Sequence, residues 1–132
     1  MTPGIIQKPV FKPDIDFKVQ PDVLEERSTV VHCTVNGYPF WPTGIRIWPT
    51  TFLIQENGKR KKLLQAYNIT PYPDWKWVFH GHVFTLVFEG LDKDCLLFDL
   101  LEDIPQPGGF CIENIERNKQ DVYWVEIDGT GL

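Results

Sequence analysis

Apolar and polar residues alternate along several short stretches of the chain. Between residues 28 and 35 one set of alternate positions is apolar or small. This set comprises Thr29, Val31, Cys33 and Val35. Alternation with a period of two places such residues on one face of a β-strand. In residues 83–88 and 95–101 most successive positions are apolar, so a strand there would have apolar side chains on both of its faces. We therefore expect two central strands there, each covered on both sides.

Turn signals separate these stretches into a series of strands. Asn57-Gly58 lies between the apolar runs 44–55 and 59–67, and Asn-Gly between two such runs predicts a β-hairpin. Pro49 interrupts the first run, which is therefore expected to bend or to lie on a sheet edge. Residues 68–75 are expected to form an irregular crossing. Residues 110–116 and 122–127 are expected to form a closing strand pair.

The whole pattern predicts an all-β protein. Seven or eight strands with frequent turns are typical of an antiparallel immunoglobulin-like β-sandwich, which we place at residues 28–132. Eleven prolines argue against an all-α fold. Residues 1–27 are expected to form an extended arm, in which Ile15, Phe17 and Val19 alternate with polar residues. This arm is interpreted as a packed edge strand, an interdomain linker, or a segment exchanged with a second subunit in a homodimer.

Charge and apolar content limit the partners and the compartment. Thirteen Lys and Arg against eighteen Asp and Glu give a net charge of -5, which argues against a nucleic-acid partner. No run approaches the roughly 20 apolar residues of a transmembrane helix. Residues 1–10 do not resemble a signal peptide, although export to the periplasm or cell surface is the compartment we favour. Three cysteines allow at most one disulfide, with Cys95–Cys111 as the pair considered.

Aromatic residues associated with prolines are the main candidates for ligand binding. The chain has five tryptophans, and four of them lie in or beside proline-rich segments. The ligand-binding candidates are Tyr38, Phe40, Trp41, Trp48, Trp75 and Trp77. Exposed aromatic side chains on a β-fold suit sugar rings, proline-rich peptides or another protein. Alternatively, these rings fold over the ends of the sandwich as plugs. Four aromatic-proline steps also favour a cis peptide.

Polar residues offer weaker candidates for chemistry. His80 and His82 would share one face if they lay on a strand, and could bind a metal together with His32 or a carboxylate. The alternative is that both histidines simply face solvent. Carboxylates cluster at Asp99, Glu102 and Asp103, where we expect solvated turn residues and not a catalytic acid pair. The basic run 59–62 is interpreted as a solvated strand edge.

Three segments resemble a known group of proteins. They are Phe84-Thr-Leu-Val-Phe-Glu-Gly-Leu91, Leu97-Phe-Asp-Leu-Leu-Glu102 and Gly109-Phe-Cys-Ile-Glu-Asn-Ile115. In this order they are similar to uncharacterised bacterial β-sandwich modules with the pattern FTL.F..L, FD..E and F.I..I. The resemblance covers roughly residues 28 to 127. It implies a β-sandwich that occurs alone or beside thioredoxin-like exported domains, and it implies no catalytic residue.

The sequence therefore predicts a non-catalytic binding or scaffolding module without a cofactor. A protein or a glycan is the expected ligand class. Two alternatives are a carbohydrate-binding module that uses the exposed aromatics, and a metal-dependent enzyme that uses His80 and His82.

Overall fold

The fold is all-β. The structure, a computed structural model, describes residues 13–17 and 28–130, which contain ten strands and no helix. The strands are β1 (Ile15–Asp16), β2 (Thr29–Asn36), β3 (Thr43–Ile45), β4 (Thr51–Gln55), β5 (Arg60–Tyr67), β6 (Lys76–Val78), β7 (Val83–Phe88), β8 (Leu97–Glu102), β9 (Cys111–Glu116) and β10 (Val122–Asp128). Within these described ranges, no helix is long and apolar enough to cross a membrane.

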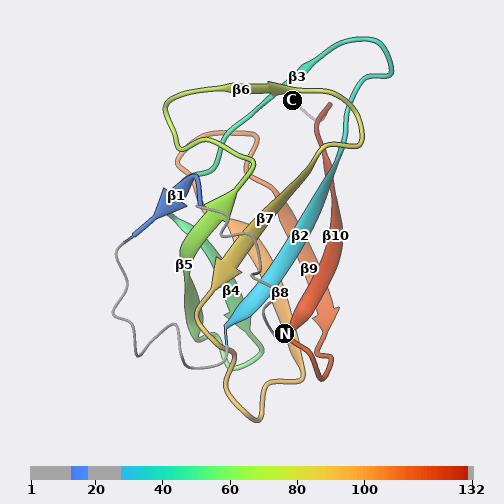
Figure 1. The fold of residues 1–132 in the computed structure, drawn as a ribbon. Helices are drawn as coiled ribbons and strands as arrows, with labels where there is room; N and C mark the ends of the chain where they lie inside the picture. Colours follow the sequence, from blue (N-terminus) through green and yellow to red (C-terminus); the bar gives the residue numbers. More distant parts are fainter. Residues whose placement is uncertain (1–12, 18–27, 131–132) are drawn as a thin grey trace, which may run out of the picture.

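One strongly curved sheet of eight strands forms the body of the molecule (Figure 1). Its order is β10-β2-β7-β5-β4-β8-β9, with β1 paired to β5 beside β4. Each strand is hydrogen-bonded to the next along one continuous path, so the two separate sheets of an immunoglobulin-like sandwich are not confirmed. All pairs are antiparallel except β10 with β2, which is parallel.

The predicted closing pair at 110–116 and 122–127 is wrong, although both segments are strands. β9 pairs with β8, and β10 pairs with β2. Between them Asp121 has a positive φ of 54°, and its carbonyl accepts a hydrogen bond of 2.9 Å from the Val30 amide. This bond directs the chain to the edge of β2 instead of back along β9.

Alternating side chains from the curved sheet fill the core as the sequence predicted. The buried positions of β2 are those of the predicted apolar face, beginning at Thr29. Among the largest fully buried side chains are Phe84, Phe88, Phe98, Leu53 and Leu100. They come from β7, β8 and β4, so the sheet encloses one continuous core. All three cysteines are free, with Cys111 exposed.

A second sheet of two strands, β3 and β6, crosses one end of the molecule (Figure 1). The existence of this second sheet shows how Pro49 interrupts the predicted strand. The predicted first arm 44–55 divides at a turn that contains this proline, so that β3 leaves the main sheet and β4 joins it. The predicted hairpin holds for β4 and β5. Residues 68–75 are irregular as expected, and the Tyr72–Pro73 peptide is cis.

Part of the N-terminal arm packs as an edge strand of its own chain. β1 pairs antiparallel with the second half of β5, on the side where β4 pairs with the first half. Ile15 is buried, and the Asp14 carboxylate accepts a hydrogen bond from the Asn68 amide. Within residues 13–17 the arm thus contains a two-residue strand that pairs with β5. The rest of the arm, including Val19, lies outside the described residues.

Candidate ligand-binding surface

Exposed aromatic side chains gather around β3 and β6 at one end of the fold. They come from the loop before β3 and from the segment that contains β6. The exposed aromatics of these two segments are Tyr38, Phe40, Trp41, Tyr72, Trp75, Trp77 and Phe79. Five of the six residues predicted from the sequence are therefore exposed here, and Trp48 is half-buried. Tyr72 and Phe79 were not predicted as binding residues, although the 72–73 aromatic-proline step marked the first.

Trp75 and Trp77 lie side by side over Gly44. Alternate residues of an extended segment share a face, and Gly44 is the direct cross-strand partner of Trp77. A Cβ atom at residue 44 would lie 3.1 Å from Trp75 Cε3 and 3.3 Å from Trp77 Cζ3. Trp75 is nevertheless 49% exposed and Trp77 66% exposed. We call this pair the tryptophan platform, because the missing side chain at Gly44 lets two exposed rings pack against one backbone.

A stack of rings and one guanidinium supports the platform from the side. Trp48 stacks on Tyr72 with ring centroids 3.7 Å apart. The guanidinium carbon of Arg46 lies 4.7 Å from the centroid of the Tyr72 ring and 3.8 Å from that of Trp75. Arg46 also donates a hydrogen bond of 3.0 Å to the Pro73 carbonyl. Cation–π contacts of this kind restrain the Trp75 ring.

The loop before β3 carries Tyr38, Phe40 and Trp41. Phe40 and Trp41 are the most exposed of the large hydrophobic side chains of the described residues. The Gly37 amide donates a hydrogen bond of 3.2 Å to Nδ1 of His80, which connects this loop to the turn after β6. Among the described residues, no ring contact joins these three aromatics to the platform. They flank the platform and are not part of it.

A hollow of about 140 Å³ opens beside the platform and contains a buried carboxyl group. Trp48 and Trp75 line it, and so does Glu102 at the end of β8. The expectation that Glu102 is a solvated turn residue is wrong, because it is only 7% exposed. Burial raises the pKa of Glu102 to about 7, against the hydrogen bonds from backbone amides and the attraction of Arg46. Its Oε2 atom accepts a hydrogen bond of 3.3 Å from the Trp48 amide.

The histidines of the predicted metal pair lie in a turn and not on a strand. His80 and His82 flank Gly81, whose φ is 90°, so strand alternation does not place them on one face. His80 Nδ1 accepts the Gly37 amide, and His82 Nε2 lies 2.7 Å from the Asn68 carbonyl. No group of three His, Cys, Asp or Glu side chains that could hold a metal ion occurs within residues 13–17 and 28–130.

His32, the third ligand considered, lies on the outer face of β2. Its Nδ1 is 2.7 Å from the Thr85 hydroxyl, and its ring lies against Trp124 with centroids 4.3 Å apart. Burial lowers the pKa of His32. Trp124 is the remaining exposed tryptophan, and it belongs to this separate face of the sheet.

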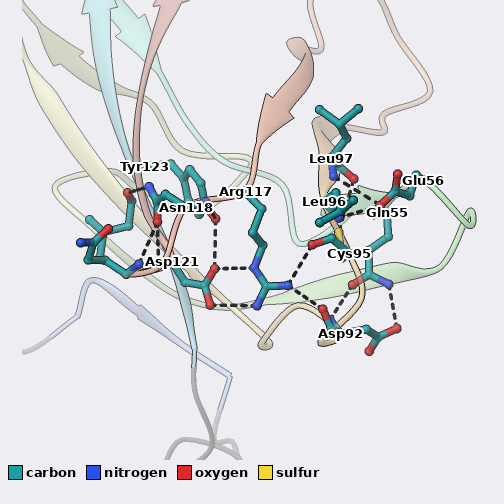
Figure 2. A network of polar contacts seen from close by, with 12 residues as sticks. Gln55, Glu56, Asp92, Cys95, Leu96, Leu97, Arg117, Asn118, Asp121 and Tyr123 are labelled. Carbon is teal, nitrogen blue, oxygen red and sulfur yellow. Dashed lines mark hydrogen bonds and ion pairs between the residues drawn. The ribbon is translucent and has the colours of Figure 1, made fainter.

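A polar network lies at the end of the fold opposite β3 and β6, where the loops after β7 and β9 meet (Figures 1 and 2). Arg117 donates two hydrogen bonds to the Asp121 carboxylate, at 2.8 and 3.2 Å. It also donates to the carbonyls of Asp92 and Cys95, at 2.6 and 3.1 Å. Tyr123 donates its hydroxyl to Asp121 at 3.0 Å. The network joins the loop after β7 to the loop after β9, and its hydrogen bonds pair these groups with one another.

Comparison with known proteins finds no matching family model, no matching curated protein and no matching solved structure. The resemblance to bacterial β-sandwich modules therefore stays a prediction.

Proposed function

We propose that the protein is a non-catalytic binding module and that its ligand docks on the tryptophan platform. One observation carries this proposal: Trp75 and Trp77 lie side by side over Gly44 and remain 49% and 66% exposed. Tryptophan supplies a large apolar area with few rotatable bonds, so two preorganised rings give binding energy at low entropic cost. A role as plugs would require these rings to be buried.

Besides a protein segment, a glycan is a ligand class that this surface suits. Adjacent rings packed on one backbone present a broad apolar surface, and the apolar side of a sugar ring stacks on such a surface. The Arg46 stack, with its guanidinium 3.8 Å from the Trp75 ring centroid, keeps that ring oriented before any ligand arrives. A protein segment rich in proline or aromatic residues would use the same rings.

The test compares two variants that lose exposed tryptophans from different faces. Calorimetric titration of the full chain with neutral oligosaccharides, proline-rich peptides and lysine-containing peptides identifies a ligand class. The Trp75→Ala/Trp77→Ala double variant is expected to lose at least about tenfold in affinity for it, since aromatic anchors dominate such interfaces. Trp124→Ala is the matched control, because Trp124 is 68% exposed and lies on β10.

Two results would contradict the proposal. One is unchanged affinity in the double variant together with its normal folding by circular dichroism. The other is a wild-type protein that binds neither the glycans nor the peptides, because the platform would then serve neither class.

A further inference from the structure

We propose that the hollow beside the platform is a subsite for a lysine side chain of a protein partner, and that Glu102 pairs with its ammonium group. This inference rests on the proposed function, because Trp75 lines both the hollow and the platform. A peptide segment that lies on the platform is therefore next to the hollow and can place one side chain into it.

The Glu102 carboxyl group has unused capacity for hydrogen bonds. It is 7% exposed, the backbone amides of Trp48 and Phe110 act on it, and the hydrogen bond from Trp48 is long, at 3.3 Å. A carboxylate offers about four acceptor positions, so about half of them are left for a ligand. In the described part of the chain no ion pair engages Glu102. Burying a carboxyl in this way is costly, and a cationic donor in the hollow would offset the cost.

The charges around the hollow favour a cation over an anion. Its charged lining consists of Arg46, Glu102 and Asp128, which is two acids and one base. The hydroxyl and amide of Thr130 hold the pKa of Asp128 below its usual range, so Asp128 is ionised at neutral pH. Arg46 has its guanidinium against Trp75 and Tyr72 and donates to Pro73. The chain as a whole carries a charge of -5, which attracts basic partners.

The shape and chemistry of the walls suit lysine in particular. Trp48, Ile104, Pro107 and Phe110 contribute apolar surface to the hollow. A lysine side chain combines a four-carbon apolar stem with a compact ammonium group, so the stem contacts the walls while the head reaches a carboxylate. The hollow of about 140 Å³ is large enough for such a side chain, since one water needs about a tenth of that space.

The probe for this subsite is Nα-acetyl-lysine N-methylamide, and its control is the same molecule with the ε-amine acetylated. Titrations at pH 8 are followed by two-dimensional amide NMR on the full chain. The charged probe is expected to shift the Trp48 amide, which donates to Glu102, and the Trp75 indole in a saturable way. The neutral probe should bind the wild-type protein at least tenfold more weakly than the charged probe does. The charged probe should also bind Glu102→Gln at least tenfold more weakly than it binds the wild-type protein.

The pH dependence provides a second readout. Glu102 pairs with the ammonium group only when it is ionised, and its pKa is about 7, whereas Asp128 stays ionised over this range. Lysine stays charged over this range, so affinity should fall roughly tenfold between pH 8 and pH 6. Glu102→Gln should bind weakly at both values.

Several outcomes would overturn the subsite. Equal shifts with the acetylated probe, equal shifts in Glu102→Gln, or the absence of saturable shifts would each do so. Saturable shifts of the Trp48 amide with a neutral oligosaccharide, and none with the lysine probe, would assign the hollow to sugar hydroxyls. These results are separable from failure of the platform, since in that case Trp75→Ala/Trp77→Ala would leave ligand affinity unchanged.

Discussion

The two ends of the fold differ in the pairing of their buried charged groups and in the exposure of their aromatic side chains. At one end Arg117 and Asp121 have side chains only 16% and 1% exposed, and they satisfy each other. At the other end the exposed Trp75 lines the same hollow as a buried Glu102, which forms no ion pair within the described residues. Both ends connect strands of the same sheet, so the sheet alone does not require this difference (Figure 1).

This difference indicates which end serves the fold and which serves a partner. Buried polar groups in native proteins are almost always paired, because an unpaired one costs free energy. An end that leaves a carboxyl under-paired and large rings exposed is less stable than the sheet could make it. Proteins accept such local costs where a ligand later supplies the missing contacts.

Removing Arg117 is the most severe test of the network end. Arg117→Ala removes a cation that donates two hydrogen bonds to the buried Asp121 carboxylate, so we expect the free energy of unfolding to fall by about 3–5 kcal/mol. Urea unfolding followed by circular dichroism measures it. Arg60→Ala is the matched control, because the Arg60–Asp103 pair is 46% and 52% exposed and should contribute less than about 1 kcal/mol. Equal effects of the two substitutions would remove the distinction between the ends.

At the aromatic end, neutralising Glu102 should raise the free energy of unfolding, whereas removing Arg117 lowers it. The folded pKa of Glu102, about 7, exceeds the ordinary value of 4.5, so the folded chain binds this proton more tightly than the unfolded chain does. Protonation therefore stabilises the fold at low pH, and that contribution is lost as the pH rises from 4.5 to above 7. Relative to wild type, Glu102→Gln should gain up to about 3 kcal/mol at pH 8.

The corresponding measurement is urea unfolding of both proteins at pH 4.5 and pH 8. At the lower value their difference should be much smaller. A Glu102→Gln variant that is less stable than wild type at pH 8 would mean that the carboxylate is already well paired.

Trp77→Ala should have the smallest effect on stability. Trp77 is 66% exposed, and surface substitutions away from buried features usually change stability by no more than about 0.5 kcal/mol. Thermal unfolding of this variant beside Trp124→Ala checks the expectation. A loss above about 2 kcal/mol would make the platform a structural element and weaken its assignment to a ligand.

Much of the fold could be predicted from the sequence because strand formation is local. The alternation in β2 and β7 and the Asn57-Gly58 turn depend on neighbouring residues, and the structure confirms them. The parallel pairing of β10 with β2 could not be predicted in this way. It depends on Asp121, whose backbone bonds to a strand about 90 residues earlier in the chain.

For the candidate site, too, one part could be predicted from the sequence and another part could not. Proline-associated tryptophans identified the exposed end from composition and position alone, which is why Trp75 and Trp77 could be named. Only the tertiary structure decided that Gly44 brings these two rings together and that Glu102 is buried beside them. The exposure of a carboxyl and the packing of two rings depend on what distant strands place next to them, and no local pattern in a sequence records that.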